Sequence, residues 1–133
     1  MFVGMARERS GYLRKAILQQ DLSAVTAACM MVDRKAWEGA GGFNEDLAVA
    51  FNDIDFCLKV RREGYLVVYE PNVELYHYES KSRGYEDTPE KQKRFLSEIN
   101  YMTAHWSEIL TKGDPYYNEN FSLNTCNYTL RKR

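Results

Sequence analysis

The segment from Asn52 to Gly64 carries start and stop signals for a helix that agree with one another. Two acidic residues, Asp53 and Asp55, lie in the expected first turn, and basic residues gather in the last turn before the glycine. This order of charges suits the helix dipole, and glycine commonly ends a helix. We therefore expect a helix over 53–63 with Asn52 as its N-cap.

Three apolar segments are expected to be strands. The run 24–32 lies between polar residues and predicts a buried strand, and the short segment 65–69 predicts a strand that stops at Pro71. Apolar and polar residues alternate over 73–79, which predicts another strand.

Further helices are expected on both sides of these strands. A short helix over 34–39 has Asp33 as its N-cap, and a weakly helical stretch covers 12–20. A long helix begins at Thr88, has Pro89 in its first position and reaches about residue 110. Mixed strands and helices favour an α/β architecture.

Composition excludes several classes of protein. The 133 residues fit one domain or part of one, and 18 basic and 19 acidic side chains give a net charge of −1. Because no basic stripe is visible, we expect no nucleic-acid partner. The three cysteines form no CxxC pair, which argues against a disulfide framework or a structural zinc site and favours a reducing compartment.

Neither a signal peptide nor a membrane span is expected. The first residues include Arg7, Glu8 and Arg9, where a signal peptide would need an apolar stretch. No apolar run approaches the ~20 residues that cross a bilayer. The sequence thus predicts a cytoplasmic chain, compatible with work at the inner face of a membrane.

Asp53 is the first candidate for chemistry. At about 100° per residue, Asp53 and Asp55 point about 200° apart, so one pocket cannot receive both. Asp55 has Lys59 four residues on, and capping together with this pair explains it without chemistry. Asp53 has no such cation on its face, so its carboxylate could act as a general base. A capping role is the alternative for Asp53.

His77 is the second candidate. It shares one face of its expected strand with Val73 and Leu75, where a histidine is more often a packed core residue than a metal ligand. No second histidine or cysteine lies nearby at a ligand spacing. Any other metal ligands would have to come from outside this chain.

Two loops are weaker candidates. Residues 79–84 combine hydroxyls with Lys81 and Arg83, which suits contact with phosphate oxygens, although many surface loops look alike. Trp37 and the segment 41–45 could form a shelf on which a sugar stacks. A simple packed turn explains that aromatic segment better from composition alone.

Four segments occur in an order that resembles the second half of family 2 glycosyltransferases with the GT-A fold. They are GGFNE, NDIDFCLKVRREGY, HYESKSRG and, more loosely, DPYYNENF. The resemblance is closest to bacterial members that build rhamnose-containing or related surface polysaccharides. It implies the acceptor-side half of a GT-A domain, α/β in class, with a mixed sheet and a long C-terminal helix. Residues 1–22 would then be a linker or lid, 23–112 the catalytic half and 113–133 a tail packed on it.

The resemblance also implies roles for individual residues. Asp53 takes the place of the catalytic base that removes a proton from the acceptor hydroxyl, although the family often has Glu where this chain has Asn52. His77 matches a histidine that helps to hold a divalent metal on the donor diphosphate. The implied substrate-binding residues are Trp37, Gly42, Phe43, Asn44, Glu45, Asp55, Ser80, Ser82 and Arg83.

The implied reaction is an inverting transfer of a sugar, with rhamnose as the candidate, from a nucleotide-diphosphate donor to a glycan or lipid-linked acceptor. A divalent metal, Mn or Mg, would neutralise the departing diphosphate, and one carboxylate suffices for a single displacement. The family's nucleotide-binding first half, with its DxD motif, has no counterpart in this sequence. We therefore expect the chain alone to be inactive and metal-free, and to self-associate through apolar surface left uncovered by that missing half.

Two other functions stay open. The chain could be a carbohydrate-binding or protein-interaction module that keeps the scaffold without catalysis. A small hydrolase that uses Asp53 and His77 is disfavoured because the sequence lacks a nucleophile-elbow motif.

Overall fold

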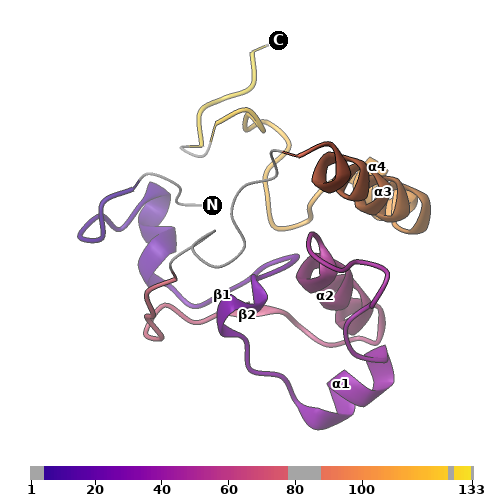
Figure 1. Cartoon of the computed structure of the whole chain (residues 1–133). Helices are drawn as coiled ribbons and strands as arrows, with labels where there is room; N and C mark the ends of the chain where they lie inside the picture. The colour runs from indigo at the N-terminus through magenta and orange to yellow at the C-terminus, as the bar shows by residue number, and fades with distance from the viewer. Residues whose placement is uncertain (1–4, 78–87, 126–127, 133) are drawn as a thin grey trace.

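The computed structural model describes residues 5–77, 88–125 and 128–132 (Figure 1). This part of the chain is mixed α/β, mostly helical, with one small sheet. In chain order the elements are the 3-10 helix η1 (Tyr12–Ile17), strand β1 (Gln20–Asp21), the 3-10 helix η2 (Ala27–Cys29), helices α1 (Arg34–Ala40) and α2 (Asn52–Arg62), strand β2 (Val68–Tyr69), and helices α3 (Pro89–His105) and α4 (Ser107–Lys112).

The sheet joins the start of the chain to the segment after α2. Strands β1 and β2 are antiparallel, with Gln20 opposite Tyr69. The N–H of Leu22 extends the pairing by donating to the carbonyl of Val67 at 2.8 Å, and both side chains are buried. The strand predicted over 65–69 is thus present, but shortened to β2.

The prediction of a strand over 24–32 is wrong. This run contains η2 and otherwise has no regular secondary structure, and Met31 is 98% exposed. A strand needs a hydrogen-bonded neighbour, and no other segment of the described chain pairs with this run. The strand over 73–79 is wrong for its described part, 73–77, for the same reason: the segment is exposed and forms no ladder.

Local signals predicted the helices better. The Asp33 side chain accepts from the N–H groups of Lys35 and Ala36 and so caps α1. Thr88 caps α3, and Pro89 opens it. The long helix predicted to residue 110 is instead divided at Trp106 into α3 and α4.

Helix α2 lies where it was predicted, but its cap is different. Asn52 is already helical, and the N-cap is Phe51, in a left-handed conformation with φ of 64° and no capping side chain. The weak helix predicted over 12–20 is only partly present: the 3-10 helix η1 ends at Ile17, Leu13 and Arg14 inside it have positive φ, and Gln20 belongs to β1. Among the described helices, none has the length and apolar character needed to cross a membrane.

The main core lies where α2 meets α3 and α4. Its buried members are Leu47 in the loop before α2, Leu58 of α2, Met102 of α3 and Trp106 at the α3–α4 junction. The core therefore fixes the loop before α2 against the C-terminal helices.

A second cluster consists of aromatic rings from both ends of the described chain. Tyr12 stacks on Tyr128 with ring centroids 4.9 Å apart, and Phe121 meets the Tyr12 ring edge-on at 5.3 Å. Tyr117 lies 5.6 Å from Tyr128. We call these four residues the ring cluster.

Candidate functional site

Asp53 lies in the first turn of α2 and is half-buried. Its Oδ2 accepts a hydrogen bond from the N–H of Ala27 at 3.2 Å, and its Oδ1 accepts from the N–H of Ile54 at 2.9 Å. Ala27 begins η2, so this carboxylate bridges two segments. No ion pair to Asp53 occurs within the described residues, so its negative charge is met only by backbone dipoles there.

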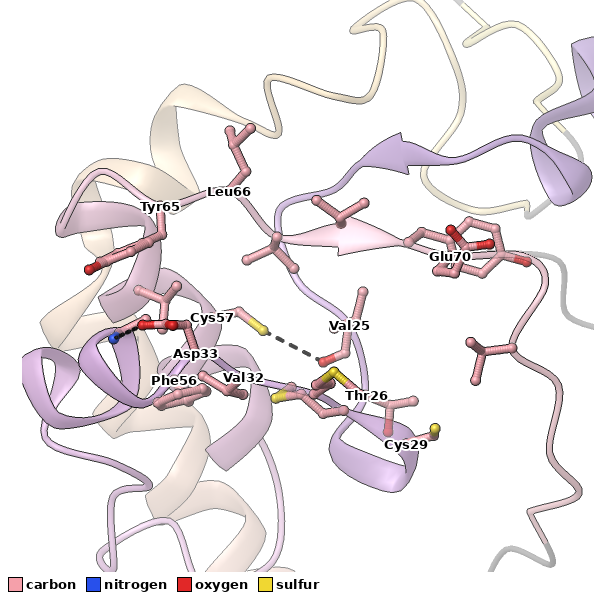
Figure 2. Close-up of a pocket in the computed structure, with 18 residues that line it drawn as sticks. Val25, Thr26, Cys29, Val32, Asp33, Phe56, Cys57, Tyr65, Leu66 and Glu70 are labelled. Atoms are coloured by element: carbon pink, nitrogen blue, oxygen red, sulfur yellow. Dashed lines mark hydrogen bonds between the residues drawn. The ribbon is translucent and has the colours of Figure 1, made fainter.

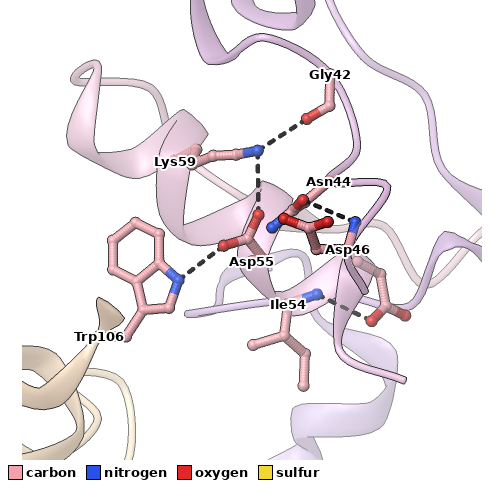
Figure 3. Close-up of polar contacts among 8 residues, drawn as sticks. Gly42, Asn44, Asp46, Ile54, Asp55, Lys59 and Trp106 are labelled. Atoms are coloured by element: carbon pink, nitrogen blue, oxygen red, sulfur yellow. Dashed lines mark hydrogen bonds and ion pairs between the residues drawn. The ribbon is translucent and has the colours of Figure 1, made fainter. Parts of the chain in front are cut away.

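Asp55 faces a different set of neighbours. It is 1% exposed, and its Oδ1 accepts from the indole Nε1 of Trp106 at 2.8 Å. Its Oδ2 pairs at 3.0 Å with Lys59, which also donates to the carbonyl of Gly42 at 3.1 Å (Figure 3). Asp55 therefore holds α2, the glycine turn and the α3–α4 junction together. A contact between Asp55 and substrate stays a prediction.

The aromatic segment forms a packed turn. Trp37 lies 5.1 Å from Phe43 and 5.0 Å from Phe56, measured between ring centroids. Gly42 has φ of +68°, and a Cβ there would lie 3.0 Å from the Trp37 ring. Trp37 and Phe43 remain 39% and 40% exposed, so their outer faces are accessible from solvent.

Of the other predicted substrate residues of this turn, Asn44 is half-buried and Glu45 lies on the surface. The side chain of Asn44 accepts from the N–H of Asp46 at 3.0 Å, which orders the loop, and Glu45 is exposed. Their proposed contact with acceptor or sugar stays a prediction.

His77 is exposed and ends the described segment 5–77. Ser80, Ser82 and Arg83 lie outside the described residues. No hydrogen bond or ion pair within the described chain joins His77 to Asp53. Nor does that part of the chain group three potential metal ligands. The pairing of base and metal ligand thus stays a prediction.

A largely apolar hollow of about 500 Å³ lies beside η2, α1 and α2 (Figure 2). The segment 65–70 and Val73 form its other side. Inside it the Cys57 thiol donates to the carbonyl of Val25 at 3.7 Å, and burial, with a smaller contribution from Asp53, raises the pKa of this thiol. Neither Asp53 nor His77 is among its described lining residues.

Glu98 of α3 is a buried polar residue that sequence reasoning missed. It is 1% exposed, and its two carboxylate oxygens accept from the N–H groups of Val49 and Ala50. The available signal was its place on the helix face of Tyr101 and Met102, three and four residues on, where a charged side chain is unusual.

Curated proteins provide partial relatives. The chain is 49% identical over 124 residues to an uncharacterised protein, y4gI, of Sinorhizobium fredii; the match covers 92% of this chain and 14% of that protein. It is 35% identical over 109 residues to the O-antigen biosynthesis protein RfbC of Myxococcus xanthus, covering 82% of this chain and 8% of RfbC.

A shorter match involves the N-acetylglucosaminyl-diphospho-decaprenol L-rhamnosyltransferase of Mycobacterium tuberculosis. The identity is 32% over 60 residues, which are 45% of this chain and 20% of that enzyme. No family model and no solved structure matches the chain. The chain thus spans between 8% and 20% of the length of these relatives. It is similar, over part of their length, to proteins named for O-antigen biosynthesis and for rhamnosyl transfer.

Proposed function

We propose that this chain is the acceptor-side part of an inverting glycosyltransferase of family 2 with a GT-A fold. The donor is a nucleotide-diphosphate sugar, with rhamnose as the candidate sugar. The acceptor is a glycan or a lipid-linked glycan presented at the cytoplasmic face of a membrane. The names of two partial relatives support the general class, and the segments quoted above support the finer assignment.

The position of Asp53 carries the proposal. Its carboxylate is half-buried at the start of α2 and is oriented by two backbone N–H groups without a neutralising cation among the described residues. A general base needs this combination of fixed orientation, partial access and negative charge. Asp53 would take the proton of the acceptor hydroxyl while that oxygen attacks the anomeric carbon, and the bond to the diphosphate breaks on the opposite side.

The apolar hollow supports the idea that more of the enzyme packs here. Two apolar side chains that line the hollow are largely exposed: Met31 at 98% and Val73 at 59%. Uncovered apolar surface of this kind commonly marks an interaction site. The relatives contain much more chain than the matched part. We assign the hollow to contact with the nucleotide-binding half.

The described residues do not by themselves fit a metal site, because no three potential ligands are grouped among them. His77 is exposed and would contribute one ligand, with the others supplied by the nucleotide-binding half. When bound, Mn or Mg would neutralise charge on the donor diphosphate. The chemistry proposed for this chain rests on Asp53.

Asp53→Asn in the complete transferase tests the proposal. The amide has a similar shape and keeps one of the two hydrogen bonds, to Ala27 or to Ile54, but it cannot accept a proton. Turnover should therefore fall by about 10²–10⁴. Donor affinity, measured by calorimetry with the nucleotide sugar, should stay the same because Asp53 acts on the acceptor.

Glu108→Gln is the matched control, since Glu108 is an exposed carboxylate on α4. It should keep wild-type turnover. If the Asp53→Asn enzyme also turned over at the wild-type rate, Asp53 would be a helix-capping residue and the non-catalytic module would become the better assignment.

A further inference from the structure

We propose that Glu98 is a positioning residue for the catalytic carboxylate: it fixes the loop from which α2, and with it Asp53, begins. This inference rests on the function proposed above. Glu98 touches neither Asp53 nor, in our assignment, the substrate, so its effect is transmitted through the backbone of residues 49–52.

The carboxylate of Glu98 accepts hydrogen bonds from two backbone N–H groups, those of Val49 and Ala50, and we call this bidentate contact the clamp. Oε1 of Glu98 lies 3.0 Å from the N of Val49, and Oε2 lies 3.1 Å from the N of Ala50. Consecutive N–H groups that point at one carboxylate define the direction of the backbone as well as its distance. Hydrogen bonds to a charged acceptor are also roughly twice as strong as neutral ones.

The carboxylate of Glu98 is buried, and Val49 and Ala50 are half-buried. Glu98 is 1% exposed and Arg94, one turn earlier on α3, has its Nε 3.8 Å from Oε1. A buried carboxylate needs hydrogen bonds and opposite charge to offset its lost hydration. Because the loop supplies two of those hydrogen bonds, a shift of the loop would leave the charge poorly satisfied.

The loop held by Glu98 leads directly into the first turn of α2, which carries the proposed base Asp53. Phe51 follows Ala50 and adopts the left-handed conformation that turns the chain into α2. The carbonyl of Phe51 accepts from the N–H of Asp55 at 2.8 Å, the first hydrogen bond of the helix. Asp53 lies between these two residues, so the direction of its side chain follows the geometry of residues 49–51.

The unusual backbone at Phe51 needs such support. Non-glycine residues rarely adopt φ near +60°, and no side chain of the described residues caps this helix. The Phe51 ring stacks on Phe95 of α3 with centroids 5.6 Å apart. Helix α3 therefore holds the start of α2 at two neighbouring points, one polar and one aromatic.

Glu98→Gln tests the clamp in the 133-residue chain itself. Glutamine offers one oxygen and one NH₂ group, so it can satisfy only one of the two loop N–H donors. Amide hydrogen exchange, read residue by residue by NMR, should become about tenfold faster at Val49 and Ala50 than in the wild-type chain. Exposed Glu90→Gln, on the same helix, should leave exchange unchanged.

The catalytic part is tested in the complete transferase. Glu98→Gln should lower kcat by about 10–100-fold, because a small misplacement of the base is costly, while KM for the donor stays the same. In the Asp53→Asn background Glu98→Gln should cause no further loss, since the group that it positions is gone. A merely structural role would lower activity equally in both backgrounds.

Several outcomes overturn the inference. It is wrong if exchange at Val49 and Ala50 is unchanged, or if kcat is unchanged in a chain whose clamp has loosened. It is also wrong if the losses from Glu98→Gln and Asp53→Asn multiply. Full turnover of Asp53→Asn would refute the proposed function instead. The hydrogen-exchange rates would then still show whether Glu98 orders the backbone at Val49 and Ala50. Should Glu98→Gln fail to fold, Glu98→Asp, which keeps the charge but shortens the reach, serves for the same comparisons.

Discussion

The indole Nε1 of Trp106 donates to Oδ1 of Asp55 across 2.8 Å, although the two residues are 51 positions apart in the chain. Both side chains are buried, and the contact joins the α3–α4 junction to the first turn of α2. It therefore couples the folding of the C-terminal helices to that of the proposed catalytic helix.

Trp106→Phe should destabilise the chain by about 1.5–3 kcal/mol, because the buried Asp55 carboxylate loses a hydrogen bond and, among the described side chains, keeps only Lys59 as a partner. Urea denaturation measures the effect. Trp37→Phe is the matched control, since the Trp37 indole makes no hydrogen bond to the described residues, and it should cost less. Equal losses in the two variants would show that the ring rather than the N–H group matters.

Two glycines should respond to alanine in opposite ways. Gly42 has φ of +68°, and a new Cβ would meet the Trp37 ring at 3.0 Å, so Gly42→Ala should cost more than about 1 kcal/mol. Gly39 lies inside α1, and apart from its chain neighbours and the backbone of its own helix, no described atom lies within 4 Å of its Cβ position, so Gly39→Ala should stabilise by roughly 0.5–1 kcal/mol. Thermal unfolding of both variants checks the signs. A stabilised Gly42→Ala chain would contradict the packed turn.

The cysteines should differ in reactivity. Burial raises the pKa of the Cys57 thiol, while Cys29 is exposed. Iodoacetamide at pH 8 should therefore alkylate Cys29 before Cys57, as read by peptide mass spectrometry. Equal labelling of the two thiols in the folded chain would argue against the packing around Val25 and Cys57.

The same thiol predicts a dependence of stability on pH. A thiol whose pKa is higher in the folded than in the unfolded chain contributes stability below the unfolded pKa, and that contribution is lost as the pH rises through the folded pKa. Stability should thus decline above about pH 8.5, and less so in Cys57→Ala. Melting curves between neutral and alkaline pH measure the difference between the two chains.

The isolated chain should self-associate through the apolar hollow. Light scattering should give a mass above that of the monomer which falls on dilution. Met31→Lys, at a position 98% exposed beside the hollow, should lower that mass, whereas Leu96→Lys, at a 58% exposed position on α3, should not. A monomer at every concentration would refute the uncovered interface.

Helix positions could be predicted because their signals are local. Asp33, Thr88 and Pro89 act within one turn of their own helices, and the structure confirms each of them. The run 24–32 failed because apolar character alone does not provide a strand with a hydrogen-bonded neighbour, which depends on residues far away in the chain. The opposite faces of Asp53 and Asp55 also followed from helix geometry, and the two carboxylates do contact different segments.

The missed features all depend on long-range contacts. Nothing near Trp106 in the sequence breaks a helix, and its indole bonds instead to a carboxylate that only the tertiary fold brings close. The same holds for the loop before α2: Phe51, with its left-handed backbone, stacks on Phe95, and Glu98 accepts from the N–H of Val49, 49 positions away in the chain. For His77, Ser80, Ser82 and Arg83, the sequence-based roles stay predictions.

The ring cluster has a practical consequence for anyone who shortens this polypeptide. Tyr12 comes from the first helical turn and Phe121 and Tyr128 from far downstream, yet they share one apolar contact. Trimming either end by itself would leave aromatic faces in water on the end that remains. A soluble shorter version should therefore lose both terminal regions together or keep both.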